Sequence, residues 1–127
     1  MVNDNPCRAL IVDDDELMRN LLTGLLPEMG AEVVGEAKDG VEALAAFDEL
    51  RPDITFLDIK MPVKDGTEAL RDIIASDPDA IVVMLSAISD IDVAETCREA
   101  GARHYIRKGT APPILKIMLQ AGLDLAK

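Results

Sequence analysis

The sequence predicts an α/β fold, a doubly wound five-stranded parallel sheet with helices on both faces. Apolar runs alternate with helical patterns five times along the chain, which is the order of a parallel sheet joined by crossover helices. The run 81–85 is apolar at every position, as expected of a strand that is covered on both faces. At 127 residues the chain has the length of one domain with its own core, so we predict a single domain over residues 1–127.

Five strands are expected, each a short apolar run bounded by polar or turn-forming residues. Their approximate ranges are 9–12, 32–37, 53–57, 80–85 and 104–106. The first and the third are directly followed by acidic residues, and this is where we look for a functional site.

Helices are expected between the strands. The first begins near Asp15 and ends before Gly30, the second follows Asp39 and Gly40, and the third covers about residues 67–75. The residues expected to point inward are Leu17, Met18, Leu21, Leu22 and Leu25 in the first helix, and Val41, Ala43, Leu44 and Phe47 in the second.

The last two helices have recognisable start or stop signals. The fourth begins after Ser89 or Asp90, either of which suits an N-cap, and stops at Gly101, a residue type common just beyond a helix end. The fifth follows Pro112 and Pro113, which suit a first helical turn, and one face of it is enough to cover the sheet. We expect Ile114, Leu115, Met118 and Ala121 on that inner face, and Ile117, with Leu119 beside it, facing outward.

Composition argues against several classes of function. The chain has 13 Lys and Arg against 24 Asp and Glu, a formal net charge of −11, which disfavours direct binding to nucleic acid or to an anionic membrane. The start of the chain lacks the apolar segment of a signal peptide, and no apolar stretch approaches the roughly 20 residues of a transmembrane helix. Cys7 and Cys97 match no metal-ligand spacing, so we expect reduced thiols in a cytoplasmic protein.

Acidic residues gather where two of the expected strands end. Asp13, Asp14 and Asp15 follow the first strand, and Asp58 follows the third. If these strands are parallel neighbours, the carboxylates meet at one edge of the sheet and repel one another. Such a cluster suits a hard divalent cation, Mg²⁺ before a softer metal. Asp15 has a simpler interpretation as the cap of the first helix, and we prefer it.

A hydroxyl and an ammonium are expected at the same edge. Ser86 follows the fourth strand and Lys108 follows the fifth, and open parallel sheets bind ligands beyond the carboxyl ends of their strands. A carboxylate such as Asp58 can attack phosphorus. A metal and an ammonium can neutralise charge on the equatorial oxygens while the hydroxyl donates a hydrogen bond. The set therefore suits phosphoryl transfer.

Four motifs in register resemble the receiver domains of two-component response regulators, in particular those of the chemotaxis-regulator type. The motifs are residues 10–15 (LIVDDD), 53–62 (DITFLDIKMP) with Asp65-Gly66, 84–87 (MLSA) and 101–108 (GARHYIRK). The resemblance covers essentially the whole chain and implies a flavodoxin-like sheet with strand order 2-1-3-4-5.

The resemblance also implies a role for each site residue. Asp58 would be the phosphoryl acceptor, and Asp13 and Asp14 the pair that holds Mg²⁺, with Asp58 and the backbone carbonyl of Lys60 completing the ligands. Ser86 would be the switch hydroxyl, Lys108 the paired ammonium and Tyr105 an aromatic rotamer switch.

The function implied is a phosphorylation-dependent signalling switch. It would accept its phosphoryl group from a histidine kinase or a phosphotransfer protein, catalyse only its own phosphorylation and dephosphorylation, and act on a downstream target protein. The fourth helix, fifth strand and fifth helix would form its output face and a possible homodimer contact. The chain would be either a stand-alone regulator or a domain of a longer protein.

One position departs from the family pattern. The family usually has proline after the lysine, often with a cis peptide bond, whereas Gly109 follows Lys108 here. A cis bond without proline costs about 2.5–4 kcal/mol, so we expect a trans bond.

Two other functions share part of the pattern. The Asp13-x-Asp15 spacing resembles the nucleophile loop of haloacid-dehalogenase-like phosphatases, but Leu17 stands where that family has Thr or Val, and its chains are usually longer. A flavodoxin-like cofactor module would need a Ser/Thr/Gly-rich phosphate loop after the first strand, and two Phe, one Tyr and no Trp offer little to stack on a flavin.

Overall fold

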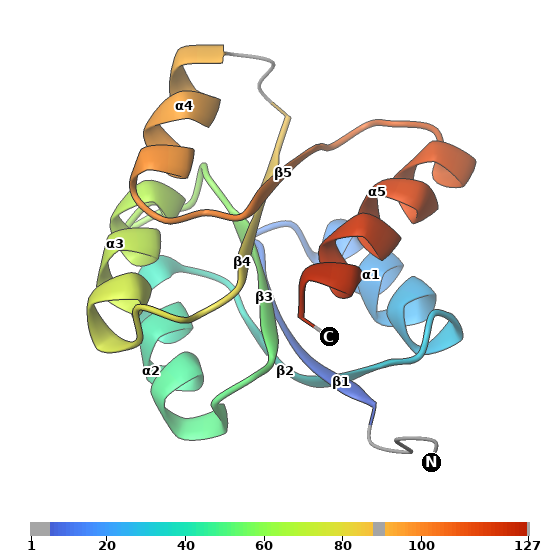
Figure 1. The fold of residues 1–127 in the computed structure, drawn as a ribbon, viewed down its shortest axis with the longest axis horizontal. Helices are drawn as coiled ribbons and strands as arrows, with labels where there is room; N and C mark the ends of the chain where they lie inside the picture. The colour runs from blue at the N-terminus through green and yellow to red at the C-terminus, as the bar shows by residue number, and fades with distance from the viewer. Residues whose placement is uncertain (1–5, 88–90, 127) are drawn as a thin grey trace.

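The computed structural model describes residues 6–87 and 91–126, and these form one open sheet between two layers of helices (Figure 1). The five strands are β1 (Cys7–Val12), β2 (Ala31–Ala37), β3 (Ile54–Asp58), β4 (Val82–Ser86) and β5 (His104–Arg107). The five helices are α1 (Glu16–Glu28), α2 (Gly40–Leu50), α3 (Gly66–Ser76), α4 (Ile91–Glu99) and α5 (Pro112–Leu125). The predicted fold class is confirmed.

All neighbouring strands are parallel, and their order in the sheet is β2-β1-β3-β4-β5, as predicted. The chain first adds β2 on one side of β1 and then adds β3 on the other. The strand order therefore reverses at β1 and β3, and open α/β sheets place their ligands beside such a reversal.

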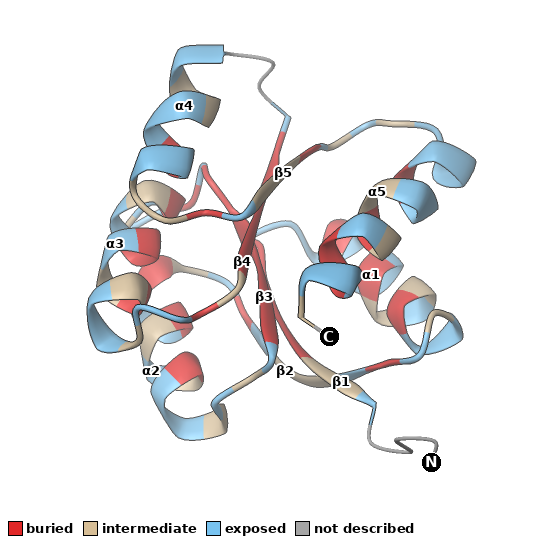
Figure 2. Ribbon diagram, in the orientation of Figure 1, coloured by how far each residue is buried: buried red, intermediate tan, exposed pale blue. Residues whose placement is uncertain are grey.

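The sheet divides the core into two layers. Helices α1 and α5 cover one face, and α2, α3 and α4 cover the other (Figure 1). Consecutive residues of one strand serve opposite layers: Phe56 packs on the α1/α5 side and Leu57 on the side of α2, α3 and α4. Both are completely buried, and Figure 2 shows the central strands as the most continuously buried part of the fold.

The expected inner face of α1 was partly wrong. Leu17 is 78% exposed and Leu21 is 40% exposed, while the buried residues are Met18, Leu22 and Leu26. The buried face of α1 therefore consists of every fourth residue and is narrower than the apolar face that the sequence predicted. In α2, Val41 is likewise exposed.

The expected inner face of α5 also needs correction. Leu119 is fully buried, whereas Ile114 and Ala121 are exposed. The buried face of the helix is formed by residues spaced by four, namely Leu115, Leu119 and Leu123. The expectation for Ile117 is confirmed, because 69% of its surface is exposed.

Aspartates cap three of the helices. Asp15, Asp39 and Asp65 each accept a hydrogen bond from a backbone N–H in the first turn of α1, α2 and α3, which satisfies one of the orphan donors there. The capping role preferred for Asp15 is therefore present. Ser89 and Asp90, suggested as caps of α4, lie outside the described residues.

Two further expectations concern the backbone. No peptide bond within residues 6–87 and 91–126 is cis, so the bond between Lys108 and Gly109 is trans, as predicted. Gly109 has φ +82°, a conformation that glycine adopts without strain. Among the described helices, none is long and apolar enough to cross a membrane.

Candidate functional site

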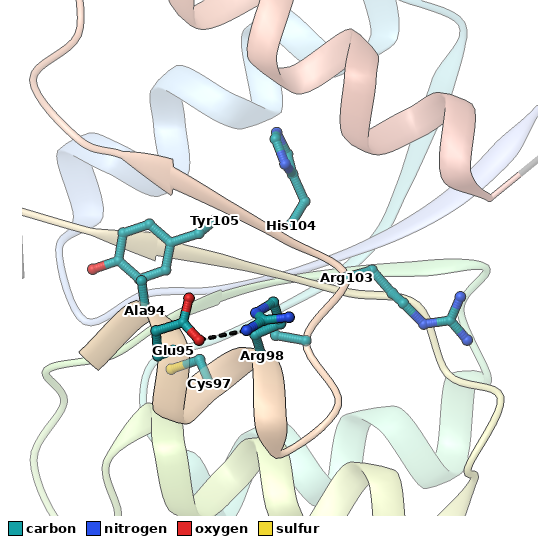
Figure 3. A pocket seen from close by; sticks show the side chains of 8 residues that line it. Ala94, Glu95, Cys97, Arg98, Arg103, His104 and Tyr105 are labelled. Carbon is teal, nitrogen blue, oxygen red and sulfur yellow. Dashed lines mark hydrogen bonds and ion pairs between the residues drawn. The ribbon is translucent and has the colours of Figure 1, made fainter. Parts of the chain in front are cut away.

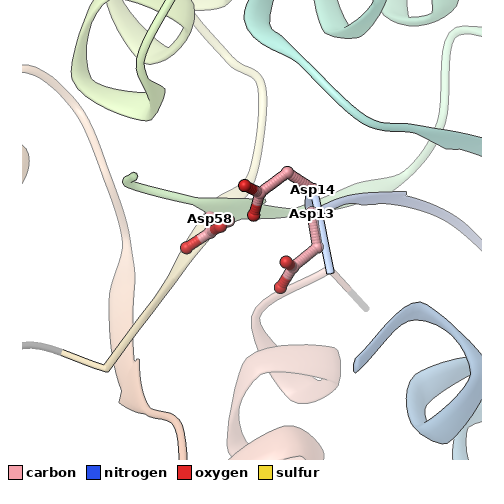
Figure 4. Close-up of side chains that lie close together, drawn as sticks. All are labelled: Asp13, Asp14 and Asp58. Atoms are coloured by element: carbon pink, nitrogen blue, oxygen red, sulfur yellow. The ribbon is translucent and has the colours of Figure 1, made fainter. Parts of the chain in front are cut away.

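Three carboxylates meet at the carboxyl edge of the sheet. Asp13 and Asp14 directly follow β1, and Asp58 is the last residue of β3. Because Val12 is paired with Leu57 in the ladder between these strands, the residues that follow them emerge side by side. One oxygen from each of the three carboxylates lies within 4.8 Å of the others (Figure 4).

Lys108 is the cation of this cluster. Its Nζ lies 2.6 Å from Asp13 Oδ2 and 3.1 Å from Asp58 Oδ1. Its backbone N–H donates to the carbonyl of Ser86 at 2.7 Å, which holds the loop after β5 against the end of β4. The sequence thus placed Lys108 correctly at the site, although Gly109 follows it.

Burial controls the charge of Asp58. Asp58 is 3% exposed, and its pKa is raised from 3.8 to about 7, first by burial and then by the negative charge of Asp13. Lys108 acts in the opposite direction. Burial lowers the pKa of Lys108, but the close contact with the Asp13 carboxylate and the charge of Asp58 outweigh this effect, so the pKa is raised overall. The lysine is therefore charged near neutral pH.

The residues present fit a hard divalent cation. Asp13 Oδ2 is buried and, within the described part of the chain, accepts no hydrogen bond of normal geometry, although Lys108 Nζ is close to it. Three carboxylates with one ammonium leave excess negative charge, and oxygen ligands of this kind suit Mg²⁺. Asp14 is exposed at the mouth of the cluster. Lys60, in the loop after β3, is also exposed.

The other two expected residues lie on neighbouring strands. Ser86 is the last residue of β4 and is buried. Tyr105 lies on β5, paired with Met84 of β4, and its half-buried ring packs beside α4. There it lines a hollow of about 140 Å³ together with Ala94 and Cys97 (Figure 3).

Two glycines contact the loop after Asp58 closely, and the sequence analysis did not assign them this role. A Cβ atom on Gly66 would lie 1.9 Å from the carbonyl oxygen of Asp58, and its N–H donates to Ile59 at 2.6 Å. A Cβ on Gly40 would lie 2.4 Å from the carbonyl oxygen of Lys64, which accepts the Gly40 N–H. The Asp65-Gly66 pair is a turn signal, so the sequence indicated a special role for Gly66. Nothing in the sequence relates Gly40 to Lys64.

The loop after Asp58 contains a strained residue. Val63 has φ +68° and is 85% exposed, although a β-branched residue rarely adopts this conformation. The Lys64 N–H donates to the Pro62 carbonyl across it at 2.8 Å, which makes a γ-turn. Lys64 is in turn paired with Asp72 of α3.

Fold and site together define an α/β protein with a mainly acidic cluster of side chains beside the strand-order reversal of its sheet. A family model described as the response regulator receiver domain matches residues 9–120. The chain therefore belongs to the receiver domain family of two-component signalling, whose members are phosphorylation-dependent switches rather than enzymes that act on a separate substrate.

Known relatives agree with this assignment. The chemotaxis protein CheY of Listeria monocytogenes is 43% identical over 101 residues, which is 80% of this chain and 85% of that protein. The transcriptional regulatory protein PdtaR of Mycobacterium tuberculosis is 44% identical over 81% of this chain and 50% of its own length. Neither of these relatives supports the phosphatase alternative.

Solved structures with the same fold are also receivers. The response regulator domain of Thermotoga maritima CheB has a TM-score of 0.88 and 31% identity, with 96% of both chains covered. A CheX–CheY complex with BeF₃ and Mg²⁺ from Borrelia burgdorferi has a TM-score of 0.87 and 31% identity, with 96% of this chain and 91% of that chain covered.

Proposed function

We propose that this receiver accepts a phosphoryl group on Asp58, with Mg²⁺, from a histidine kinase or a phosphotransfer protein. One observation carries the assignment to Asp58. Asp58 is a buried carboxylate beside the acidic pair, and one of its oxygens lies 3.1 Å from the Lys108 ammonium. Asp13 is occupied by the same ammonium and by the N–H of Asp15.

The chemistry follows from the charges around Asp58. An oxygen of the ionised carboxylate attacks phosphorus, and the bond from phosphorus to the donor nitrogen breaks. Asp13, Asp14, Asp58 and the carbonyl of Lys60 would hold Mg²⁺, which would supply positive charge that favours ionised Asp58 and offsets the charge of the phosphoryl oxygens. Lys108 neutralises a further oxygen, and the Ser86 hydroxyl donates a hydrogen bond to the phosphoryl group.

The phosphoryl group would then change a surface away from the site. Ser86 moving toward it vacates space at the end of β4, and Tyr105 turns inward from β5 beside α4. The output face comprises α4, β5 and α5, and we propose that it contacts a downstream target or a second copy of the chain. The Borrelia CheY that is similar to this chain was solved bound to CheX with BeF₃, which supports a protein partner.

The domain extends over residues 1–127, is cytoplasmic, and catalyses only its own phosphorylation and dephosphorylation. The net charge of −11 supports protein partners over direct contact with nucleic acid or membrane.

Phosphorylation by a small donor tests the acceptor. Phosphoramidate with Mg²⁺ should add one phosphoryl group, seen by intact-protein mass spectrometry and labile to base as acyl phosphates are. Asp58→Asn should abolish it, whereas Asp79→Asn, an exposed aspartate with the same charge change, should not. Mapping of the group to Ser86 or Asp13 would show that the roles are misassigned. Sustained turnover of a phosphomonoester would instead favour a phosphatase.

A further inference from the structure

The backbone of Asp13 is held at both its N–H and its carbonyl group. The Asp13 N–H donates to the Ala37 carbonyl of β2 at 3.0 Å. The Asp13 carbonyl accepts a hydrogen bond from Arg19 Nη1 at 2.7 Å. Arg19 therefore holds the peptide plane from which Asp14, the exposed member of the carboxylate cluster, begins.

Arg19 is well placed to fix this peptide. It lies on α1, one turn after the cap of the helix, and its side chain is only 19% exposed. Its Nε lies 3.4 Å from Glu36 Oε1 on β2. The guanidinium thus bridges the end of β1, the first turn of α1 and the edge strand. A guanidinium offers several donors in a rigid plane, so it can hold two acceptors at once, which an ammonium does less well.

The geometry points to Arg19 as a positioning residue for the divalent cation. Three carboxylates must converge for the ion, and Asp13 and Asp58 are already buried and paired with Lys108. Asp14 is exposed, and the carbonyl group that precedes it is held by Arg19. We propose that Arg19, oriented by Glu36, fixes the direction of the Asp14 carboxylate and so raises the affinity for Mg²⁺.

Two effects of Arg19 on the metal have opposite signs, which makes the inference testable. A cation near an acidic site repels Mg²⁺, so removal of its charge alone would tighten binding. Loss of positioning would weaken binding, and partners that orient metal ligands are typically worth 10- to 100-fold in metal affinity. The inference rests on the proposed Mg²⁺ site. It predicts that the loss of positioning outweighs the relief of charge repulsion, so that removal of Arg19 weakens Mg²⁺ binding.

The experiment compares Mg²⁺ dissociation constants by isothermal titration calorimetry. Arg19→Gln should weaken binding about tenfold, and Arg19→Lys, which keeps the charge, should fall between it and the wild type. Glu36→Gln should cause a smaller loss. Arg103→Gln is the control, because this exposed arginine precedes β5 at the opposite edge of the sheet and should leave the affinity unchanged.

A measurement without metal separates positioning from loss of the fold. In Mg²⁺-free buffer, amide hydrogen exchange should accelerate at Asp14 and Asp15 in Arg19→Gln, while amides of the buried β1 strand keep their protection. If Arg19→Gln does not fold, Arg19→Lys and Glu36→Gln carry the comparison. An Arg19→Gln protein that binds Mg²⁺ as tightly as the wild type, or more tightly, overturns the inference alone. A wild type that binds no Mg²⁺ overturns the proposed metal site and the inference with it.

Discussion

Substitution of the acceptor should stabilise the metal-free protein. The pKa of Asp58 is raised from 3.8 to about 7, first by burial and then by the charge of Asp13. Each pKa unit corresponds to about 1.4 kcal/mol, so ionised Asp58 costs the fold up to about 4 kcal/mol at pH 8. Asp58→Asn removes this charge with little change in shape, and we expect the variant to be more stable than the wild type at pH 8.

The sign of the pH dependence follows from the direction of the shift. A group with a raised pKa in the folded state holds its proton there more tightly than in the unfolded chain. The stability from this group is therefore fully present below about pH 4 and is lost as the pH rises through about 7. The free-energy difference between wild type and Asp58→Asn should thus grow between pH 4 and pH 8 and level off above it.

Urea denaturation followed by far-UV circular dichroism measures this difference, and urea does not screen charge. Asp79→Asn is the charge-matched control and should show no comparable pH dependence in its difference from the wild type. Saturating Mg²⁺ should reverse the order at pH 8, because the ion favours ionised Asp58. A metal-free Asp58→Asn that is less stable than the wild type at pH 8, or a difference that is constant from pH 4 to pH 8, would refute the reasoning.

Four other substitutions test neighbouring parts of the structure. Millimolar Mg²⁺ should raise the melting temperature of the wild type, since ligand at 100 times its dissociation constant contributes about 2.7 kcal/mol, and Asp13→Asn should blunt the rise in a thermal shift titration. Val63→Gly should stabilise the fold by about 1 kcal/mol in urea, because it relieves the positive φ, and an unchanged midpoint would argue against strain. Gly66→Ala should cost about 3 kcal/mol, since its Cβ meets the Asp58 carbonyl, and should slow labelling by phosphoramidate. Ile117→Glu should prevent any beryllofluoride-induced increase in apparent mass in analytical ultracentrifugation; dimers that persist in this variant would exclude α5 from the interface.

The ends of the strands could be predicted from the sequence. A short apolar run marks the position of a strand, and it therefore also marks the residue that directly follows the strand. Asp13 and Asp58 follow such runs, and parallel pairing then brings them together. The helix faces were less certain. Apolar residues line two adjacent rows of α1, and the sequence does not tell which row the sheet covers; the structure buries Leu22 and leaves Leu21 40% exposed.

Contacts made by loops were beyond the reach of the sequence pattern. Arg19 has the ordinary appearance of a polar helix residue, and its bond to the Asp13 carbonyl depends on the path of the chain between β1 and α1. Gly40 approaches Lys64 only because α2 and the loop after β3 lie side by side. Neither relation has a periodic or spacing signal.

The division of the core by the sheet has a consequence for how this domain can change. Phe56 and Leu57 are neighbours in the chain, but their side chains belong to layers that are separated by the sheet. Sites with no shared partners usually contribute additively to stability. Variants selected in the α1/α5 layer and in the layer of α2, α3 and α4 should therefore combine without mutual compensation, so the two outer surfaces can acquire new recognition properties along independent evolutionary paths.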